Sequence, residues 1–352
     1  MRRKEKQFRQ DLISNFRYNA PEHFCSGIIF REKYMKIVFL DAKTLGQDID
    51  IQCFSKLGDM IVYDNTEDKD VTERIRGAQV VLTNKCNIDG SAMAASPELK
   101  YIGLAATGYN NIDVEYAGKN GIAVTNVKGY STDTVAQHTF ALLLSLMENI
   151  KYYDSYIKEY QYAKSDVFTS IERPFMELSG KIWGIIGLGE IGRKVADIAS
   201  AFGCKVIYYS TTGNNNNPNY ERAEFDKLLT DSDIISVHAP LNENTRAMMN
   251  YDAFSKMKRS AYFINVGRGA IVVEKDLRRA LDEGCIAGAG LDVFEKEPVE
   301  AQCELLKVKN PDRLIMTPHI AWAATEARIR LVEEMYRNIE AFYKGERRNR
   351  VD

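Results

Sequence analysis

Three side chains with complementary chemistry each follow an apolar stretch in the second half of the chain. Arg268 lies in "INVGRGAIV", Glu297 in "GLDVFEKEP" and His319 in "TPHIAWA". An Arg can hold a carboxylate through two N–H donors and polarise an adjacent carbonyl. A His can give a proton near neutral pH, and a Glu bonded to its other ring nitrogen fixes the tautomer and favours the charged form. These residue types suit the reduction of a 2-oxo acid, in which a cofactor supplies the hydride.

Each of the three residues also has a structural explanation. Taken alone, His319 is a packing residue in an apolar setting, Arg268 a charge on a surface loop, and Glu297 the start of a helix before a proline. Their order along the chain favours the functional interpretation. In an open α/β sheet, the loops at the carboxyl ends of neighbouring strands converge on one crevice.

Short apolar segments alternate with helical patterns in two sections of the chain, which predicts an α/β fold with doubly wound, nearly parallel sheets. Residues 134–150, "TVAQHTFALLLSLMENI", are apolar on nearly every face and predict a helix buried on all sides, packed between domains or subunits. Residues 325–346 predict a long amphipathic helix that begins at a Thr with a Glu close behind. The predicted strands are "KIVFL", "MIVYD", "VVLTN", "YIGLA" and "IAVTN", then "KIWGIIGLG", "KVIYYS", "DIISVHAP", "AYFINVG", "AGLDVF" and "LIMTPH".

A glycine pattern, Gly187-x-Gly189-x-x-Gly192, stands directly after one predicted strand and opens a helix. In that context the glycines allow a tight turn, a close approach of the backbone to a pyrophosphate, and close packing of helix on strand. The alternative is a tight turn with no ligand. The position between a strand and a helix favours the first interpretation, a dinucleotide cofactor.

The next predicted strand ends in Ser210, where an acidic residue is expected to hold the ribose 2′-hydroxyl. The hydroxyls of Ser210, Thr211 and Thr212 would not repel a 2′-phosphate, but no Arg or Lys follows at once to attract one. The nearest basic side chain in sequence is Arg222. We therefore expect NAD or NADP as cofactor, with the preference open.

The composition excludes several other classes of function. The 352 residues carry a formal charge of −2, which does not favour nucleic acid or an anionic membrane as partner. No apolar run approaches the roughly 18 residues that span a bilayer. Residues 1–34 are basic without the apolar stretch of a signal peptide, and we expect an extension without function. The irregularly spaced cysteines predict reduced thiols in the cytoplasm: Cys25, Cys53, Cys86, Cys204, Cys285 and Cys303.

Five ordered segments together resemble the D-isomer-specific 2-hydroxyacid dehydrogenases: "GIIGLGEIGRKVA", "SVHAPLNENT", "INVGRGAIV", "GLDVFEKEP" and "TPHIAWA". The resemblance runs from Met35 to the end of the chain. Within the family, "LAATGYNNIDVE", "TNVKGYSTDTVAQHTFALLL" and the Trp in "HIAWA" are similar to glycerate dehydrogenases, also called hydroxypyruvate reductases.

The resemblance implies two Rossmann-like domains around a cleft. Residues 35–133 and 321–352 would form a flavodoxin-like substrate domain, and residues 134–320 an NAD(P)-binding Rossmann domain. It also implies a homodimer through the cofactor domains. The implied reaction is the reversible reduction of hydroxypyruvate or glyoxylate to D-glycerate or glycolate.

The resemblance further implies roles for individual residues. Arg268 matches the substrate-binding arginine, Glu297 the glutamate that orients the histidine, and His319 the acid/base. Asp292 matches the carboxylate that holds the nicotinamide carboxamide, while the backbone amides of Thr107 and Gly108 would receive the substrate carboxylate. The expected cofactor-binding set is Gly187, Gly189, Glu190, Ile191, Gly192, Ser210, Thr211, His238, Ala239, Pro240, Thr245, Val266, Gly267 and Asp292. We expect no metal ion.

Some residues keep two interpretations. Lys85 is a solvated charge or a substrate ligand, Trp322 a wall of the substrate pocket or a packing residue, and His138 a packing or interface residue. His238 is expected to contribute shape rather than proton transfer.

Two rival functions remain: an NAD(H)-sensing binding protein like the C-terminal-binding corepressors, and a family member that acts on D-lactate or 3-phosphoglycerate. A phosphorylated substrate requires extra basic residues in the cleft, and the sequence cannot place Lys85 or Arg313 there.

Overall fold

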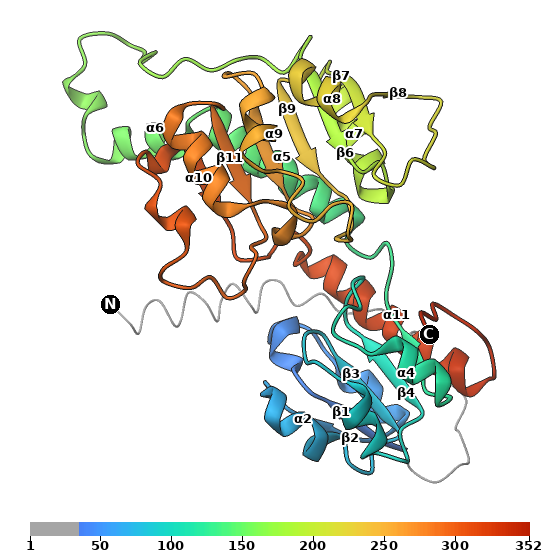
Figure 1. The fold of residues 1–352 in the computed structure, drawn as a ribbon. Coiled ribbons are helices and arrows are strands. Elements are labelled where there is room, and N and C mark those ends of the chain that lie inside the picture. The colour runs from blue at the N-terminus through green and yellow to red at the C-terminus, as the bar shows by residue number, and fades with distance from the viewer. Residues whose placement is uncertain (1–34) are drawn as a thin grey trace. The chain divides into compact units, whose positions relative to one another are not determined.

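The computed structural model describes residues 35–352, which divide into two compact units. Unit 1 comprises residues 35–131 and 323–352, and unit 2 comprises residues 132–322. The chain therefore leaves unit 1, builds unit 2 and returns (Figure 1). Residues 1–34, for which we expect an extension without function, lie outside the described residues. Among those that are described, no helix is long and apolar enough to cross a membrane.

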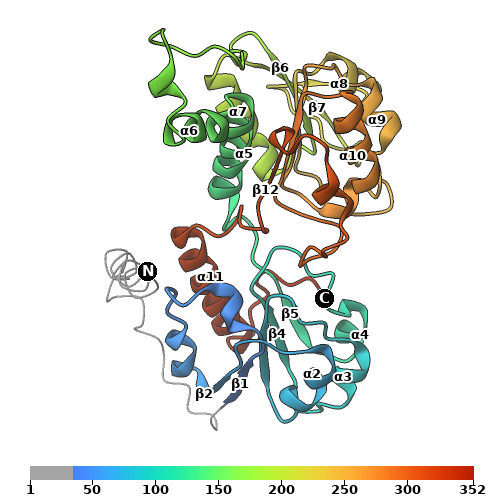
Figure 2. The same cartoon turned by 90° about the vertical axis from the view of Figure 1, so that its left-hand side faces the viewer.

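Unit 1 is built on a parallel sheet of five strands in the order β2-β1-β3-β4-β5. This is the flavodoxin-like order of a doubly wound sheet. In Figure 2, helices α2 to α4 cover one face of the sheet and α11 the other. The strands are β1 Met35–Phe39, β2 Gly58–Val62, β3 Val80–Thr83, β4 Tyr101–Leu104 and β5 Ala123–Thr125. The helices are α2 Asp68–Ile75, α3 Gly90–Ala94, α4 Val114–Lys119 and α11 Thr325–Tyr343.

Unit 2 is built on a parallel sheet of seven strands in the order β12-β11-β10-β9-β6-β7-β8. The direction of winding reverses between β6 and β9, as at the switch point of a Rossmann sheet, where dinucleotides bind. The strands are β6 Ile182–Ile186, β7 Lys205–Tyr209, β8 Glu221–Arg222, β9 Ile234–Val237, β10 Tyr262–Asn265, β11 Gly288–Leu291 and β12 Leu314–Met316. The helices are α5 Thr132–Met147, α6 Ile150–Lys158, α7 Glu190–Ala201, α8 Phe225–Asp231, α9 Tyr251–Lys256 and α10 Glu274–Glu283.

Alternate side chains of the central strands enter two different cores, as strand geometry requires. On β6, Ile185 belongs to the core shared with α5 and α7, and the next residue, Ile186, belongs to the core under α8, α9 and α10. The predicted fold class is confirmed, with every predicted strand present. The added strand β8 has two exposed residues and no apolar pattern, so its sequence gave no signal.

Two predictions about helices are wrong in part. Helix α5 is not buried on all sides, because Gln137 and Ala141 are exposed one turn apart while the other faces pack within unit 2. Helix α11 begins at Thr325, as predicted, but ends at Tyr343 rather than at residue 346, and Gly345 beyond it has a left-handed φ of 78°. Ala324 is the N-cap without a side-chain hydrogen bond, and the Thr325 hydroxyl accepts from Arg328. Glu326 in the first turn still favours the helix through its dipole.

Candidate active site

The three predicted catalytic residues lie beyond the carboxyl ends of three adjacent strands. Strands β10, β11 and β12 pair in parallel, so their carboxyl ends share one edge of the sheet. Arg268 follows β10, Glu297 follows β11 and His319 follows β12. The topology therefore gathers the three loops at one edge of unit 2.

His319 and Glu297 are joined by a hydrogen bond of 2.6 Å between Nδ1 and Oε2. A carboxylate only accepts, so Nδ1 carries the proton and Nε2 is left for a substrate. The other carboxylate oxygen of Glu297 accepts from the backbone N–H of Phe294 at 2.9 Å, which fixes the orientation of the carboxylate. The two side chains are 25% and 32% exposed, so the pair is reachable from solvent.

The backbone at His319 is held in a left-handed conformation, with φ of 53°. A residue other than glycine adopts this region at a cost of about 1–3 kcal/mol, which the surroundings must offset. Asp292 provides the anchor: its carbonyl accepts from His319 N at 2.8 Å, and its carboxylate accepts from the N–H groups of Ile320 and Ala321 at 2.9 and 2.8 Å. The Asp292 side chain is 1% exposed. The structure thus gives Asp292 a role in shaping the His319 turn that the sequence did not suggest.

Arg268 is positioned by a buried asparagine that the sequence analysis did not select. Asn265, the last residue of β10, accepts from Gly267 N and donates to Arg268 O, each at 3.0 Å. The Arg268 guanidinium is half-buried and donates to Gly267 O at 2.8 Å. A guanidinium has five N–H donors in a fork, so a face remains for a carboxylate.

The loop that carries Arg268 lies directly against the loop that carries Glu297. A Cβ on Gly269 would stand 1.8 Å from the carbonyl carbon of Phe294. Only glycine allows the two backbones to approach this closely. Phe294 in turn donates to Glu297, so Arg268, Glu297 and His319 belong to one continuous assembly of loops.

The glycine-rich loop has the geometry that a pyrophosphate requires. Gly187 has φ of 92° and lies against Ala239, whose backbone nitrogen would be 2.8 Å from an added Cβ. Gly192 packs under the carbonyl of Gly187. Gly189 has open space where its Cβ would stand, at the N-terminus of the 12-residue helix α7. Phosphate oxygens fit such an open backbone cradle, because unpaired N–H groups and the helix dipole both favour an anion.

The loop beyond β7, where the sequence predicts the ribose of the cofactor, contains hydroxyls and a cation. Ser210 is buried, and its Oγ accepts from Asn215 N at 3.2 Å. Arg222 pairs in register with Tyr208 across β7 and β8, although it lies 14 positions further along the chain. Its guanidinium donates to Gly213 O at 2.9 Å. No Arg or Lys directly follows Ser210 in the sequence. The pairing of β7 with β8 instead brings the Arg222 guanidinium to the 210–213 loop.

The expected residues beyond β9 differ in their access to a ligand. Pro240 is exposed, whereas Thr245 is fully buried, and its hydroxyl donates to Pro240 O at 2.7 Å. Thr245 therefore shapes the loop from inside. His238 shares a hydrogen bond of 2.9 Å with Ser236, and burial lowers its pKa to about 3. His238 is thus neutral near pH 7, which is consistent with the expected role in shaping the site.

Other expected residues of this half differ in exposure. Glu190 is exposed and Ile191 half-buried at the start of α7, Val266 is buried, and Thr211 is half-buried. The partly buried Trp322 packs on the core under α5 and α7. Arg313 precedes β12, whereas His319 follows it, so Arg313 lies at the opposite end of that strand from the catalytic residues. No group of three or more potential metal ligands occurs among residues 35–352.

The expected substrate residues Thr107, Gly108 and Lys85 belong to unit 1. Thr107 and Gly108 follow β4, where the Thr107 hydroxyl donates to Val127 O at 2.8 Å and leaves the side chain exposed. Lys85 follows β3, and its backbone N–H donates to the buried Asp41 at 2.6 Å. Both loops extend from the carboxyl edge of the unit 1 sheet.

A doubly wound nucleotide-binding sheet that carries Arg, Glu and His on adjacent strand ends defines an NAD(P)-dependent oxidoreductase. Residues 140–321 match the family of D-isomer specific 2-hydroxyacid dehydrogenase NAD binding domains. The chain belongs to the D-isomer-specific 2-hydroxyacid dehydrogenases.

Curated relatives and solved structures agree with this membership. The chain is 39% identical to a hydroxypyruvate reductase of Blautia hydrogenotrophica, over 88% of this chain and 98% of the relative. It is 35% identical to a glycerate dehydrogenase of Methylorubrum extorquens, over 90% and 99%. D-lactate dehydrogenase from Aquifex aeolicus, complexed with NAD and lactic acid, matches with a TM-score of 0.77, 30% identity and coverage of 88% and 96%. An NADPH-dependent glyoxylate/hydroxypyruvate reductase from Sinorhizobium meliloti, in complex with NADP and malonate, matches with a TM-score of 0.77, 26% identity and coverage of 91% and 97%.

Proposed function

We propose that this protein reduces a small 2-oxo acid, hydroxypyruvate or glyoxylate, to the D-2-hydroxy acid with NADH or NADPH. The observation that supports this most strongly is the His319–Glu297 hydrogen bond of 2.6 Å on the same sheet edge as Arg268. The names of the hydroxypyruvate reductase and glycerate dehydrogenase relatives favour this substrate class. The reverse oxidation uses the same groups.

Each residue of the assembly has one task in the proposed reaction. The bound nicotinamide cofactor supplies the hydride. Arg268 holds the substrate carboxylate and polarises the carbonyl that accepts the hydride. His319 gives the proton on Nε2 to the developing alkoxide and keeps the proton on Nδ1, which stays bonded to Glu297. Before the proton transfer, Glu297 stabilises the charged imidazole of His319. After the transfer, its hydrogen bond to Nδ1 keeps the neutral ring in the same orientation.

We assign Thr107, Gly108 and Lys85 to substrate binding on the basis of the family resemblance. Unit 1 would then be the substrate domain and unit 2 the cofactor domain. Asp292 stays the proposed partner of the nicotinamide carboxamide, in addition to its contacts with the His319 turn. We also propose a cytoplasmic location, which the free thiols of Cys86, Cys204, Cys285 and Cys303 favour.

For the cofactor, we propose that NADPH is accepted at least as well as NADH. Ser210 places a hydroxyl where an Asp would repel a 2′-phosphate, and Arg222 brings a positive charge to the same loop. The Sinorhizobium meliloti structure contains NADP, which is consistent with this proposal.

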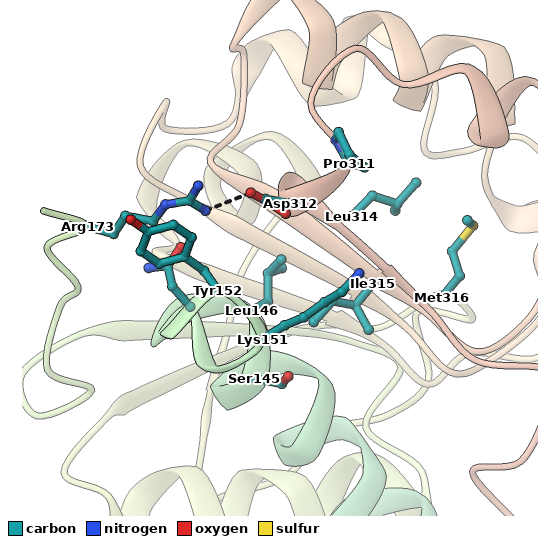
Figure 3. Close-up of a pocket in the computed structure, with 11 residues that line it drawn as sticks. Ser145, Leu146, Lys151, Tyr152, Arg173, Pro311, Asp312, Leu314, Ile315 and Met316 are labelled. Atoms are coloured by element: carbon teal, nitrogen blue, oxygen red, sulfur yellow. Dashed lines mark hydrogen bonds and ion pairs between the residues drawn. The ribbon is translucent and has the colours of Figure 1, made fainter. Parts of the chain in front are cut away.

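We propose a homodimer through unit 2, formed by the segment 150–175 rather than by α5 alone. This segment leaves the layered part of unit 2 in Figure 1 and exposes Phe168 to 91%, Ile171 to 80% and Phe175 to 60%. Beside it, a groove of about 390 Å³ runs along the edge strand β12 (Figure 3). In the groove, Arg173 lies 3.5 Å from the Tyr152 ring and pairs with Asp312 at 2.7 Å. Exposed apolar area of this kind marks an interface.

Light scattering on a size-exclusion column tests the dimer. The double variant Phe168→Ser, Ile171→Ser should elute as a monomer at concentrations where the unaltered protein is a dimer. A variant that remains a dimer, or an unaltered protein that is monomeric, would remove this proposal and leave the catalytic one intact.

A turnover assay with purified protein tests the proposed reaction. Oxidation of reduced cofactor would be followed with hydroxypyruvate, glyoxylate, pyruvate and 3-phosphohydroxypyruvate, each with NADH and with NADPH. We expect hydroxypyruvate or glyoxylate to give the highest kcat/KM. Cofactor binding without turnover of any oxo acid would favour the corepressor-like sensor. Preference for the phosphorylated acid would overturn the proposed substrate class, and the phosphate would then need a cation other than Arg313, which lies at the far end of β12 from His319.

A further inference from the structure

A second histidine lies behind the catalytic turn, on a helix that the proposed reaction does not use. His138 belongs to α5, and its side chain is 19% exposed. Its Nε2 is 2.9 Å from the hydroxyl of Thr317 and 3.6 Å from Oδ1 of Asp292. One turn earlier on the same face, the Thr134 hydroxyl donates to Ala321 O at 3.0 Å. Two polar residues on this apolar helix therefore contact both ends of the 317–321 turn.

The direction of the hydrogen bonds between these residues follows from their chemistry. The carboxylate of Asp292 only accepts, so the Thr317 hydroxyl donates its single proton to Oδ1, at 2.6 Å. Thr317 must then accept from His138, which fixes the proton of the neutral ring on Nε2. His138, Thr317 and Asp292 thus form one chain in which each bond polarises the next.

Asp292 connects this chain of hydrogen bonds to the backbone of the catalytic His319. Its carboxylate accepts from the two N–H groups that follow His319, and its carbonyl accepts from His319 itself. The turn keeps His319 at φ of 53° only while these acceptors stay in place. A rotation of the Asp292 carboxylate would move the imidazole relative to Glu297 and the substrate.

We propose that His138 is a positioning residue for His319, acting through Thr317 and Asp292. It donates to the Thr317 hydroxyl, which in turn donates to the Asp292 carboxylate, and the carboxylate so oriented holds the catalytic turn in its left-handed conformation. This inference rests on the proposed function, in which His319 is the acid. The ordinary alternative is a packing role, in which only the volume of the ring matters.

Burial is consistent with a neutral donor. It lowers the pKa of His138, against the opposing effect of the nearby Asp292 carboxylate. The ring therefore acts near pH 7 through a neutral N–H group, and an uncharged amide at the same place can replace it. If an amide at this position restores activity and an apolar side chain does not, the hydrogen bond matters rather than the volume of the ring.

The test compares His138→Leu, which keeps apolar volume, with His138→Gln, whose amide can donate from near the Nε2 position. We expect His138→Leu to lower kcat on the order of tenfold, because small displacements of a catalytic group have effects of this size or larger. The affinity for NADH should change less than twofold, and the isotope effect with deuterated NADH should rise as chemistry becomes slower. His138→Gln should recover most of the kcat.

A matched control comes from the same helix. Thr139 is buried next to His138, but its hydroxyl donates only to Val135 O of α5 at 2.8 Å. Thr139→Val removes a buried hydroxyl without touching the catalytic turn, and kcat should be unchanged. Thermal melts of all variants separate loss of fold from loss of position. If His138→Leu does not fold, Thr317→Val cuts the same chain and should give the same loss of kcat.

The outcomes separate this inference from the proposed function. An inactive unaltered protein, or a His319→Ala variant with full activity, would overturn the proposed function itself. An active protein in which His138→Leu keeps its kcat, or in which Leu and Gln variants lose kcat equally, would overturn only the role of His138. In the His319→Ala background, His138→Leu should have no further effect, because residues that act through one another are not additive.

Discussion

The catalytic edge of unit 2 and the loop beyond β7 hold their polar groups in opposite ways. At the catalytic edge, Asp292 and Asn265 are fully buried and every loop is tied to its neighbour. Beyond β7, Thr212, Gly213 and Arg222 are exposed. Proton transfer depends on positions within fractions of an ångström, whereas a phosphate is recognised largely by charge. We therefore expect substitutions at the catalytic edge to affect the proposed reaction, and substitutions in the loop beyond β7 to affect the proposed cofactor preference.

If the catalytic edge is a tightly packed frame, a single added side chain there should have a large effect. Gly269→Val would drive a side chain into the backbone of Phe294, which an added Cβ already meets at 1.8 Å. Separation of the Arg268 and Glu297 loops should lower kcat/KM about a hundredfold or more. The stability should fall by several kcal/mol. Steady-state kinetics and chemical denaturation measure the two losses, and full activity in Gly269→Val would show that the loops need not touch.

Substitutions in the loop beyond β7 should instead act mainly on the choice of cofactor, with a cost in stability at Ser210, which is buried. Ser210→Asp adds a carboxylate where a 2′-phosphate would lie, so the ratio of kcat/KM for NADPH to that for NADH should fall about tenfold or more. Arg222→Gln should shift the same ratio in the same direction, by a smaller factor. Binding of 2′-phospho-ADP-ribose and of ADP-ribose, measured by calorimetry, provides a readout without turnover. Equal losses for both ligands would mean that Arg222 does not read the 2′ position.

Substitution of His238 should have the smallest effect on the rate of the reaction. Its main effect should be on how the stability of the protein depends on pH. The pKa is lowered from 6.5 to about 3, so the folded state resists a proton that the unfolded chain binds. Stability should therefore fall as the pH drops below 6.5 towards 3. His238→Gln should lose stability less steeply over that range, while the pH profile of kcat keeps the same shape. A profile that loses an inflection in this variant would give His238 a part in proton transfer.

The same contrast explains which features could be predicted from the sequence. The strands and the Gly187 loop could be predicted, because apolar alternation and glycine spacing are local patterns. Arg268, Glu297 and His319 could be selected because each lies in the loop that follows a strand, so one rule of topology gathers them. For these residues, the position in the chain after a strand is enough to predict the position in the fold at the edge of the sheet.

The features that were missed depend on pairing between distant segments. Arg222 reaches the 210–213 loop only because β8 pairs with β7 in the register Tyr208–Arg222. His138 reaches Thr317 across 179 positions of the chain. The available signal was the spacing of Thr134 and His138, four residues apart on an otherwise apolar helix, which places them on one face.

The role of His319 as the acid is best tested by the kcat of hydroxypyruvate reduction by His319→Ala, measured beside the affinity of the same variant for NADH. We expect unchanged NADH binding and a loss of kcat on the order of a thousandfold, within the range of general acid catalysis. A variant that binds NADH and keeps kcat within tenfold of the unaltered protein would contradict the assignment of His319 as the acid.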